Sequence, residues 1–475
     1  MARQKPKPYV LQQYCKGCGR CIDACNHHCL ELGTEIDPAT GLAPIVLHLD
    51  GCTACGLCFD ACPEPYGLAP IPEGVSGETL SPEMMFGPRR TSAPAPIAIP
   101  DQVVPMGDVP RVVVAKGTYA SAMGALLSGC RHFFGYPITP STEGAELMAK
   151  LMPQLHGHFF QAVSEVATIN MMYGCGGAGL PALTYTSSPG FSLMLEGISY
   201  MIGAELPSVV VNVMRGGPGL GNIAPEQADV KLACRGLGHG HTHAITLAPG
   251  TPQEMLDFTM LAFELAFRYR NPVIVLCDGY LGQMTGRVTL PTALVKPGLP
   301  EWAVFGDREH RGNLISSIYL LESDLEAHNM KLQRKYELIA SREARADLFQ
   351  CDDQPETLLV AFGTPSRMVK GAVRELRERG VKAGLFRPQT LWPFPIAHLL
   401  PLLRNVRRLI VVEASLGQLE DELRLALSRA EVRDAPRIES VQRAGGVLPA
   451  QSDIVAAVLG STQPRQTADR LEVVQ

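Results

Sequence analysis

Eight cysteines near the amino terminus form two runs with the same internal spacing. The first run is Cys15, Cys18, Cys21 and Cys25, and the second is Cys52, Cys55, Cys58 and Cys62. In double-cluster iron–sulfur motifs, each run gives three thiolates to one cubane and its fourth cysteine to the other. We therefore expect two 4Fe–4S clusters. The first would be bound by Cys15, Cys18, Cys21 and Cys62, and the second by Cys52, Cys55, Cys58 and Cys25.

A zinc site and disulfides are the alternative uses of these cysteines. Thiolates are soft ligands that suit zinc as well as iron–sulfur clusters. Zinc sites usually present two well-separated pairs of cysteines, and a repeated run of three with a fourth does not match that pattern. Two positions depart from the double-cluster motif, because Asn26 replaces the usual proline and Cys29 is an extra cysteine. We interpret Cys29 as a buried or loop thiol rather than as a ligand.

A second candidate site lies between Gly135 and Glu143. This stretch leaves a predicted strand and opens a predicted helix, with Thr139, Ser141 and Thr142 beside the helix start. A helix N-terminus binds anions through its free N–H groups and its dipole. The same hydroxyl groups also suit ordinary capping of the helix. From the residues alone, both interpretations stay open.

Two charged residues stand at the ends of predicted elements. Glu165 begins an otherwise apolar helix, where a carboxylate usually interacts with the helix dipole, and the residues alone favour that interpretation. Arg215 ends a strand before a glycine-rich loop that runs to Gly221. An arginine there can clamp a carboxylate with two hydrogen bonds, or it can pair with a nearby acid on a surface loop.

Two weaker patterns favour structural interpretations. The stretch from Gly174 to Gly179 matches G-x-G-x-x-G, but a helix rather than a strand precedes it, so we expect close helix packing instead of a dinucleotide site. His239, His241 and His243 alternate, which on a strand would place three imidazoles on one face. We favour a loop or a satisfied polar cluster over metal ligation. No Walker loop, zincin motif or nucleophile elbow occurs in the sequence.

The composition excludes several classes of function. The chain has 475 residues, 46% of them hydrophobic and 19% charged, which predicts a globular enzyme of two or three domains. A net charge of −5 without long basic runs argues against nucleic-acid binding. Nine of the 14 cysteines lie in one early block, which indicates thiolate ligands in a reducing, cytoplasmic compartment. We expect no signal peptide and no membrane span, because long uninterrupted apolar runs are absent.

The elements that must position these residues alternate between strands and helices. We predict a buried strand at 111–115, further strands at 133–137, 182–186, 208–213 and 272–276, and helices at 117–129, 143–152, 164–172, 191–203 and 251–268. This alternation predicts a doubly wound, mostly parallel α/β sheet. Ligands of such sheets bind at the carboxyl ends of the strands, so we expect the site in the loops after Tyr136, Thr186, Val213 and Cys277.

The remaining chain predicts a second α/β unit and several connecting segments. A long charged helix is expected at 322–347, followed by strands at 357–362, 382–386 and 409–412 and helices at 365–379 and 417–428. The segment between the cysteine runs suits a short hairpin with its turn at 38–41. We expect a ferredoxin-like domain at 1–70, a Pro/Gly-rich tether at 71–110, a first α/β domain at 111–290, a helical connector at 291–355, a second α/β domain at 356–462 and a polar tail at 463–475.

The ordered motifs of the two α/β units resemble the α subunit of the 2-oxoacid:ferredoxin oxidoreductases. These thiamine-diphosphate enzymes oxidatively decarboxylate 2-oxoacids to acyl-CoA. The stretches that resemble the family's motifs are 136–141, 164–167, 186–192, 215–218, 386–394 and 445–446. The cysteine block resembles the family's ferredoxin-like δ subunit, so the chain looks like a δ–α fusion. The resemblance implies a thiamine-diphosphate-binding-like parallel sheet domain I, as in pyruvate:ferredoxin oxidoreductase, and a transketolase-C-terminal-like domain II.

The resemblance also implies roles for single residues. Thr139 and Arg215 would hold the substrate carboxylate. Glu165 would hydrogen-bond the N1′ position of the aminopyrimidine ring of thiamine diphosphate, and Pro137 and Ile138 would contact the same cofactor. The carboxylate that composition alone assigns to a helix dipole would then be the acid–base group of the reaction.

The family's β subunit carries a Gly-Asp-Gly motif for the diphosphate and Mg²⁺, together with its own cluster. Cys277-Asp278-Gly279 is not that motif. The resemblance therefore implies that this chain shares its thiamine diphosphate and Mg²⁺ with a β subunit. It further implies a γ subunit, coenzyme A as co-substrate, and soluble ferredoxin or another electron acceptor.

The substrate is suggested by the loop from Arg215 to Gln227 and by Gly238-His239-Gly240. These stretches look most like family members that act on branched-chain 2-oxoacids. The alternatives are 2-oxoglutarate, pyruvate or an aryl 2-oxoacid. A non-catalytic electron-transfer subunit is the alternative from another class, and the joint presence of Thr139, Glu165 and Arg215 argues against it.

Overall fold

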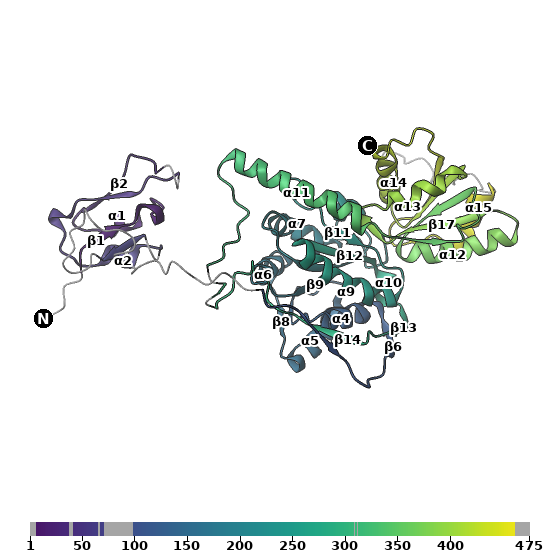
Figure 1. Ribbon diagram of the computed structural model, residues 1–475, viewed down its shortest axis with the longest axis horizontal. Coiled ribbons are helices and arrows are strands. Elements are labelled where there is room, and N and C mark those ends of the chain that lie inside the picture. Colours follow the sequence, from purple (N-terminus) through teal and green to yellow (C-terminus); the bar gives the residue numbers. More distant parts are fainter. Residues whose placement is uncertain are drawn as a thin grey trace, which may run out of the picture. The chain divides into compact units, whose positions relative to one another are not determined.

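The computed structural model describes residues 6–37, 41–64, 67–70, 98–307, 309–310 and 312–460. The chain divides into two compact units, Met1–Ala95 and Pro96–Gln475, and Figure 1 draws both as ribbons. The expected turn at 38–40, the tether from 71 to 97 and the tail at 463–475 lie outside the described residues. Because the division falls inside the expected tether, the carboxyl-terminal part of that segment belongs to the second unit.

The cluster unit consists of two similar halves, each with a strand, a 3-10 turn, a cysteine loop, a short helix and a second strand. Its elements are β1 (Pro8–Val10), η1 (Gln12–Tyr14), α1 (Arg20–Asp23), β2 (Leu30–Leu32), β3 (Ile45–Leu47), η2 (Leu49–Gly51), α2 (Leu57–Ala61) and β4 (Leu68–Pro70). β1 pairs antiparallel with β4, and β2 pairs antiparallel with β3 as the expected hairpin. Gly19 and Gly56 precede the two helices with φ of 76° and 84°, a conformation that glycine adopts without steric cost.

The apolar core of the cluster unit is small. Val10, Leu30, Ile45 and Leu68 form it together with cysteine side chains. A core of this size contributes little folding free energy, so metal ligation must supply much of it.

The second unit is organised by a seven-stranded sheet in the order β18-β11-β12-β10-β9-β7-β8. Its strands are β7 (His132–Gly135), β8 (His158–Gln161), β9 (Ala182–Thr186), β10 (Ser208–Met214), β11 (Ile245–Leu247), β12 (Pro272–Asp278) and β18 (Thr390–Trp392). Neighbouring strands are parallel except that β18 runs antiparallel to β11. The predicted doubly wound parallel sheet is confirmed. Its edge strand β18 comes from the second α/β unit, where it lies between β17 and α13 in the sequence.

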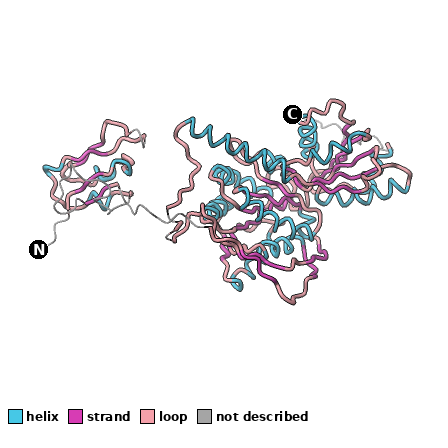
Figure 2. Tube along the Cα trace, in the orientation of Figure 1, coloured by secondary structure: helices cyan, strands magenta, loops and turns pink. Residues whose placement is uncertain are grey.

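Helices cover this sheet on both faces. They are α4 (Gly117–Leu127), α5 (Thr142–Leu151), η3 (Pro153–Leu155), α6 (Glu165–Gly177), α7 (Ser188–Gly203), α8 (Val230–Arg235), α9 (Pro252–Tyr269) and α10 (Gly279–Gln283). β10 and β12 are buried along their whole length, as is typical of parallel strands between helical layers. Figure 2 shows the helices packed around the strands of this unit.

Two antiparallel ribbons lie outside the main sheet. β5 (Gln102–Pro105) pairs with β14 (Ala293–Lys296), and β6 (Val112–Lys116) pairs with β13 (Thr285–Thr289). The expectation of a buried strand at 111–115 is therefore wrong, since Val112 and Val114 are 46% and 74% exposed. A run of valines indicates β propensity, and it does not distinguish a central strand from a surface ribbon.

A second, five-stranded sheet has the order β15-β17-β16-β19-β20. The elements of this region are α11 (Glu322–Glu343), β15 (Ala346–Phe349), β16 (Thr357–Val360), α12 (Gly363–Glu378), β17 (Ala383–Pro388), α13 (Ile396–Leu399), η4 (Leu400–Arg404), β19 (Arg408–Glu413), α14 (Gln418–Arg429), β20 (Arg437–Gln442) and α15 (Gln451–Leu459). β16, β17, β19 and β20 are mutually parallel, and β15 is antiparallel. The predicted second α/β unit is thus present.

The two sheets meet where their parallel strands end. The Gln227 side chain donates to the carbonyl of Phe362 at 3.0 Å and accepts from the N–H of Ala414 at 2.9 Å. Asp278, at the end of β12, accepts from the N–H and the hydroxyl of Thr364 at 3.0 Å and 2.6 Å. The carboxyl edge of the first sheet is therefore held against the second.

Candidate functional site

The first set of predicted cluster ligands lines one small cavity of the cluster unit. Its walls contain Cys15, Cys18, Cys21 and Cys62, together with apolar and backbone atoms. Cys62 comes from the second run, so the fold brings together the crossed set that the spacing predicts. The N–H of Ile45 donates to Cys15 Sγ at 3.4 Å, and such bonds to ligand sulfurs tune cluster potentials.

A second small cavity gathers the other set. Its walls contain Cys25, Cys52, Cys55 and Cys58, and also the extra Cys29. The N–H of Cys29 donates to Cys25 Sγ at 3.3 Å. Cys29 is buried, as expected, but it lies beside the predicted ligands rather than apart from them.

The cysteines of the two cavities are suitable ligands for iron–sulfur clusters. Four thiolates are the donor set of a 4Fe–4S cluster. The first cavity offers four cysteines, and the second offers five because Cys29 lies beside the predicted ligands.

The loops after β7 and β10 meet at Arg215, which is 7% exposed. Its Nη1 donates to the carbonyl of Thr139 at 2.8 Å, and its Nη2 donates to the carbonyl of Leu220 at 3.2 Å. Thr139 and Pro137 are exposed on the loop, and Ile138 is half-buried. The structure therefore brings together the two residues expected to bind a substrate carboxylate.

The start of α5 shows an unusual arrangement for a capping residue. Ser141 occupies the N-cap position, but its hydroxyl makes no cap hydrogen bond. It donates to the carbonyl of Ile138 at 2.7 Å instead. The capping interpretation of this hydroxyl is wrong, because the serine shapes the loop that carries Thr139.

Glu165 begins α6 and is only 4% exposed. It faces the first turn of α7, where a Cβ on Gly190 would lie 2.3 Å from Glu165 Oε1 and 2.5 Å from Thr186 Oγ1. Both distances are far below van der Waals contact, so a side chain at this position would require Glu165 and Thr186 to move. The Glu165 carboxylate is thus buried and closely packed against α7.

Three buried polar groups at the ends of β9 and β10 have no hydrogen-bond partner among the described residues. They are Thr186 Oγ1, Ser187 Oγ and Arg215 Nε. Buried polar atoms are nearly always paired, so unpaired ones indicate a site that a ligand completes. These polar groups lie close in the folded chain to Glu165 and Thr139, so they suit a polar cofactor and an anionic substrate.

The sequence left several of these residues without a role. Thr186, Ser187, Ser188 and Gly190 lie in a loop that the strand-end argument selected and in the stretch 186–192 that resembles a family motif, yet no single one of them was given a role. Asp229 was not selected, because its contacts join segments far apart in the chain. Only the tertiary structure brings these residues to Arg215.

The weaker patterns have structural roles in the folded chain. α6 extends to Gly177, and a Cβ on Gly176 would lie 2.7 Å from the carbonyl of Pro207, so the G-x-G-x-x-G match reflects close packing. The three histidines lie in a loop and not on a strand. His243 stacks on Trp392 with ring centroids 4.6 Å apart, and burial lowers its pKa to about 4.

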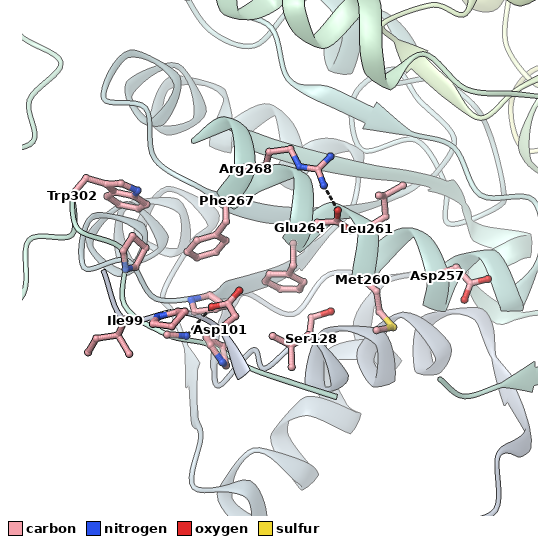
Figure 3. A pocket seen from close by; sticks show the side chains of 17 residues that line it. Ile99, Asp101, Ser128, Asp257, Met260, Leu261, Glu264, Phe267, Arg268 and Trp302 are labelled. Atoms are coloured by element: carbon pink, nitrogen blue, oxygen red, sulfur yellow. Dashed lines mark hydrogen bonds and ion pairs between the residues drawn. The ribbon is translucent and has the colours of Figure 1, made fainter. Parts of the chain in front are cut away.

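A cavity of about 670 Å³ lies at another part of the second unit. Figure 3 shows side chains that line it, among them Phe267 and Met260 of α9, Trp302 and Asp101. The ion pair between Arg268 and Glu264 lies at its edge. None of Thr139, Glu165 and Arg215 lines this cavity, so its size does not make it the site of the predicted chemistry.

The fold and site define a class of protein: an α/β enzyme subunit with buried, unpaired polar groups at its strand ends, joined to an iron–sulfur domain. Residues 123–339 match the family model for pyruvate flavodoxin/ferredoxin oxidoreductase, thiamine diphosphate binding. Residues 355–454 match pyruvate:ferredoxin oxidoreductase core domain II, and residues 14–65 match a 4Fe–4S dicluster domain. The chain belongs to the 2-oxoacid:ferredoxin oxidoreductase family and is a subunit of such an enzyme.

Named relatives agree with this assignment. The ketoisovalerate oxidoreductase subunit VorB of Methanothermobacter marburgensis is 45% identical over 347 residues, which cover 73% of this chain and 96% of the relative. The 2-oxoglutarate synthase subunit KorA of Methanocaldococcus jannaschii is 36% identical over 374 residues, covering 74% of this chain and 100% of the relative. Both are named as subunits, so they work with other chains.

A solved structure shares the fold. The 2-oxoglutarate:ferredoxin oxidoreductase from Magnetococcus marinus, determined with 2-oxoglutarate, coenzyme A and succinyl-CoA bound, superimposes with a TM-score of 0.66 at 26% identity. The match covers 74% of this chain and 66% of that chain. In the described part of this chain, no helix has both the length and the apolar character needed to cross a bilayer.

Proposed function

We propose that this chain is the α subunit, with a fused δ domain, of an oxidoreductase that acts on branched-chain 2-oxoacids. The observation that carries the proposal is the buried Arg215 guanidinium, which holds the Thr139 loop and keeps Nε unpaired. In the reaction, a 2-oxoacid and coenzyme A give acyl-CoA, CO₂, two electrons and two protons. The electrons leave through iron–sulfur clusters, and the reverse direction uses the same groups.

Arg215 and Thr139 act on the substrate. The guanidinium and the exposed Thr139 hydroxyl bind the carboxylate and orient the bond that breaks. Charge-assisted hydrogen bonds of this kind combine affinity with direction. Thr186 and Ser187 offer further unpaired hydroxyls at the strand ends for the cofactor or the substrate.

Glu165 acts on the cofactor. Thiamine diphosphate with Mg²⁺ supplies, when bound, the carbanion chemistry that decarboxylation needs. Glu165 would hydrogen-bond the N1′ position of the aminopyrimidine ring and exchange a proton with it, and Pro137 and Ile138 would contact the same ring system. The burial of Glu165 at the start of α6, next to the ends of β9 and α7, supports this role.

The chain is incomplete by itself. Asp278 is fully buried, and its carboxylate is occupied by Thr364 and the N–H of Leu281. It therefore offers nothing to a diphosphate-bound Mg²⁺. We assign that site to a β subunit, with a γ subunit completing the enzyme and soluble ferredoxin or another carrier accepting the electrons in the cytoplasm.

The choice of a branched-chain substrate rests on the relatives and on the loop after Arg215. The protein named ketoisovalerate oxidoreductase is more similar to this chain than the protein named 2-oxoglutarate synthase, at 45% against 36% identity. The loop carries two exposed apolar side chains, Leu220 and Ile223. An apolar rim suits an aliphatic side chain better than a second carboxylate.

A panel of 2-oxoacids tests the function. The chain is co-expressed anaerobically with its partner subunits, and coenzyme A-dependent reduction of a low-potential dye is measured with each acid. We expect the highest kcat/KM with a branched-chain 2-oxoacid. Highest activity with 2-oxoglutarate, pyruvate or an aryl acid would revise the substrate, and cluster reduction without any 2-oxoacid dependence would indicate an electron-transfer subunit.

Two substitutions test the roles. Glu165→Gln should lower kcat by about 100-fold or more, the usual size of an acid–base contribution. Arg215→Ala should raise KM for the 2-oxoacid at least about thirtyfold, since truncating one partner of a buried ion pair costs about 2 kcal/mol or more. Arg379→Ala, in an exposed pair with Glu375, is the control. Wild-type kinetics in either site variant would refute its assigned role.

Cysteine substitutions test the crossed ligands. Cys62→Ser should perturb the same cluster as Cys15→Ser, and Cys25→Ser the same cluster as Cys52→Ser. Iron content and the electron paramagnetic resonance of each reduced variant identify which cluster changes. If Cys62→Ser instead perturbs the cluster that Cys52→Ser perturbs, the ligands are not crossed.

A further inference from the structure

Asp229 is a buried carboxylate that the reaction as described does not use. It is 4% exposed and occupies the N-cap position of α8, but its side chain makes no cap hydrogen bond. Aspartate at an N-cap normally accepts from the helix's own N–H groups. Its carboxylate is turned elsewhere, which indicates that another set of contacts determines its orientation.

Those contacts lead to Arg215. Asp229 Oδ2 accepts from Ser188 Oγ at 2.6 Å and from Asn212 Nδ2 at 2.8 Å. The backbone N–H of Arg215 donates to the same Ser188 Oγ at 3.1 Å. Three segments therefore meet at one hydroxyl: the end of β10, the first turn of α7 and the residue before α8.

The direction of each hydrogen bond follows from chemistry. An ionised carboxylate only accepts, so Ser188 must give its proton to Asp229. The hydroxyl is then left as an acceptor, which is what the N–H of Arg215 requires. With a neutral apolar residue at 229, the hydroxyl could rotate toward the Arg215 carbonyl, which lies 3.4 Å away, and the N–H would lose its partner.

Asn212 leaves one of its polar atoms without a hydrogen bond to any described residue in this arrangement. Its amide turns the donor nitrogen to Asp229 and leaves Oδ1 buried without a partner among the described residues. Burial raises the pKa of Asp229, and the hydrogen bonds from Ser188 and Asn212 act in the opposite direction. Buried polar groups that sacrifice one hydrogen bond for another are typical of functional positions rather than of plain packing.

We propose that Asp229 and Ser188 are positioning residues for the substrate-binding arginine. Asp229 orients the Ser188 hydroxyl, the hydroxyl holds the Arg215 backbone, and the guanidinium then meets the Thr139 carbonyl at the mouth of the site. Neither residue contacts the substrate. The inference rests on the proposed function, because it assumes that Arg215 binds the 2-oxoacid carboxylate.

The experiment compares four variants in the assembled, cluster-loaded enzyme. Ser188→Ala and Asp229→Ala break the network, and Asp229→Asn keeps a carbonyl oxygen that can accept both hydrogen bonds. Ser341→Ala is the control: its hydroxyl is in α11, is exposed, and donates to the backbone carbonyl of Leu338, away from this network. KM and kcat are measured for the 2-oxoacid and, separately, KM for coenzyme A.

We expect Ser188→Ala and Asp229→Ala to raise KM for the 2-oxoacid about tenfold or more, the loss associated with a hydrogen bond that supports a charged group. KM for coenzyme A, cluster content and kcat should stay within about twofold. Asp229→Asn should recover most of the loss, and Ser341→Ala should behave as wild type. This split separates positioning from general destabilisation, which would lower active enzyme and leave KM unchanged.

Other outcomes have distinct meanings. An unchanged KM for the 2-oxoacid in Ser188→Ala overturns the proposal, as does an equal rise in KM for coenzyme A. If Asp229→Ala does not fold, Ser188→Ala and Asp229→Asn decide, with thermal midpoints measured for both. If Arg215→Ala itself leaves KM unchanged, or if wild type turns over no 2-oxoacid, the proposed function fails first and the positioning role fails with it.

Discussion

At the scale of single residues, the arrangement of the candidate site depends on Gly190, which has no side chain. Gly190 leaves room for the Glu165 carboxylate and the Thr186 hydroxyl, both of which would collide with a Cβ. A Cβ at this position would therefore force the side chains of Glu165 and Thr186 to move. The consequence can be tested without touching a charged group.

Gly190→Ala should displace Glu165 and lower kcat about tenfold or more, with a parallel loss of thiamine diphosphate affinity. A contact at 2.3 Å forces the carboxylate out of place, and misplaced catalytic groups lose rate steeply. Cofactor binding is measured by calorimetry on the assembled enzyme. Gly174→Ala in α6 is the control, since a Cβ at that position would meet no atom within 4 Å. Equal effects of both substitutions would contradict the requirement for a glycine beside Glu165.

The residue types alone predicted the cluster ligands because thiolate spacing is local and chemically specific. Thr139, Glu165 and Arg215 were different, since a helix-start carboxylate or a strand-end arginine has a common structural explanation. The resemblance to a family implied their roles, and the structure supplied the contact between Arg215 and Thr139. The individual contacts of Thr186, Ser188 and Gly190 could not be predicted from the stretch 186–192, and Asp229 could not be identified at all, because these contacts join distant segments.

At the scale of elements, strand and helix boundaries followed the predicted ranges where hydrophobic periodicity was strong, as in β9, β10, β12 and α9. The prediction failed for β6, where a valine run forms an exposed ribbon. β11 and β18 were not predicted, because strands of three residues carry too little pattern. Strands as short as these are identified only in the folded chain, by the strands with which they pair.

Helix α11 is attached to the first α/β layer by a partly buried ion pair. Lys335 donates to Glu205, and its side chain is 12% exposed. Burial lowers the pKa of Lys335 to about 8, although Glu205 acts in the opposite direction. Lys331 of the same helix also contacts Glu205 but is 58% exposed. The buried lysine therefore makes the attachment of α11 dependent on pH.

The direction in which the free energy of unfolding changes with pH follows from the number of protons that each state binds. An unfolded lysine binds its proton up to about pH 10.5, whereas folded Lys335 releases it from about pH 8. The unfolded state therefore holds more protons in this window, and the Lys335 contribution to the free energy of unfolding should rise between pH 8 and 10.5. The rise should not exceed about 3 kcal/mol.

The measurement is the urea midpoint of wild type and Lys335→Met at several pH values, followed by circular dichroism. Between pH 8 and 10.5, the urea midpoint of wild type should rise relative to that of Lys335→Met. Lys331→Met should keep the wild-type pH dependence, because its ammonium stays in water. A difference between wild type and Lys335→Met that does not vary with pH would contradict the lowered pKa.

At the scale of the whole molecule, the second α/β layer is held to the first through the loop that contains Asp229. Gln227 is fully buried, and its side chain hydrogen-bonds backbone groups just after β16 and just after β19. Asp229 lies only two residues further on. The position of the second sheet is thereby linked to Arg215 through Asp229 and Ser188.

Gln227→Leu should lower the stability of the second unit by about 2 kcal/mol or more, because two backbone groups lose their partners in a buried position. KM for the 2-oxoacid should rise as well, since the loop that supports Arg215 loses its outer attachment. Gln154→Leu, on an exposed residue of η3, should be nearly neutral. Thermal midpoints and steady-state kinetics check both effects; a stability loss without a change in KM would separate the two roles of the loop.

The pairing of β18 with β11 has a consequence for folding during synthesis. Residues 390–392 complete the edge of a sheet whose neighbouring strand, β11, lies at 245–247. During synthesis, that edge stays unpaired until the whole segment between these two strands has left the ribosome. Exposed strand edges invite association between chains. The first sheet should thus be most prone to aggregate, or most in need of a chaperone, in truncated chains that end between β11 and β18, and a pause in translation there would be harmful.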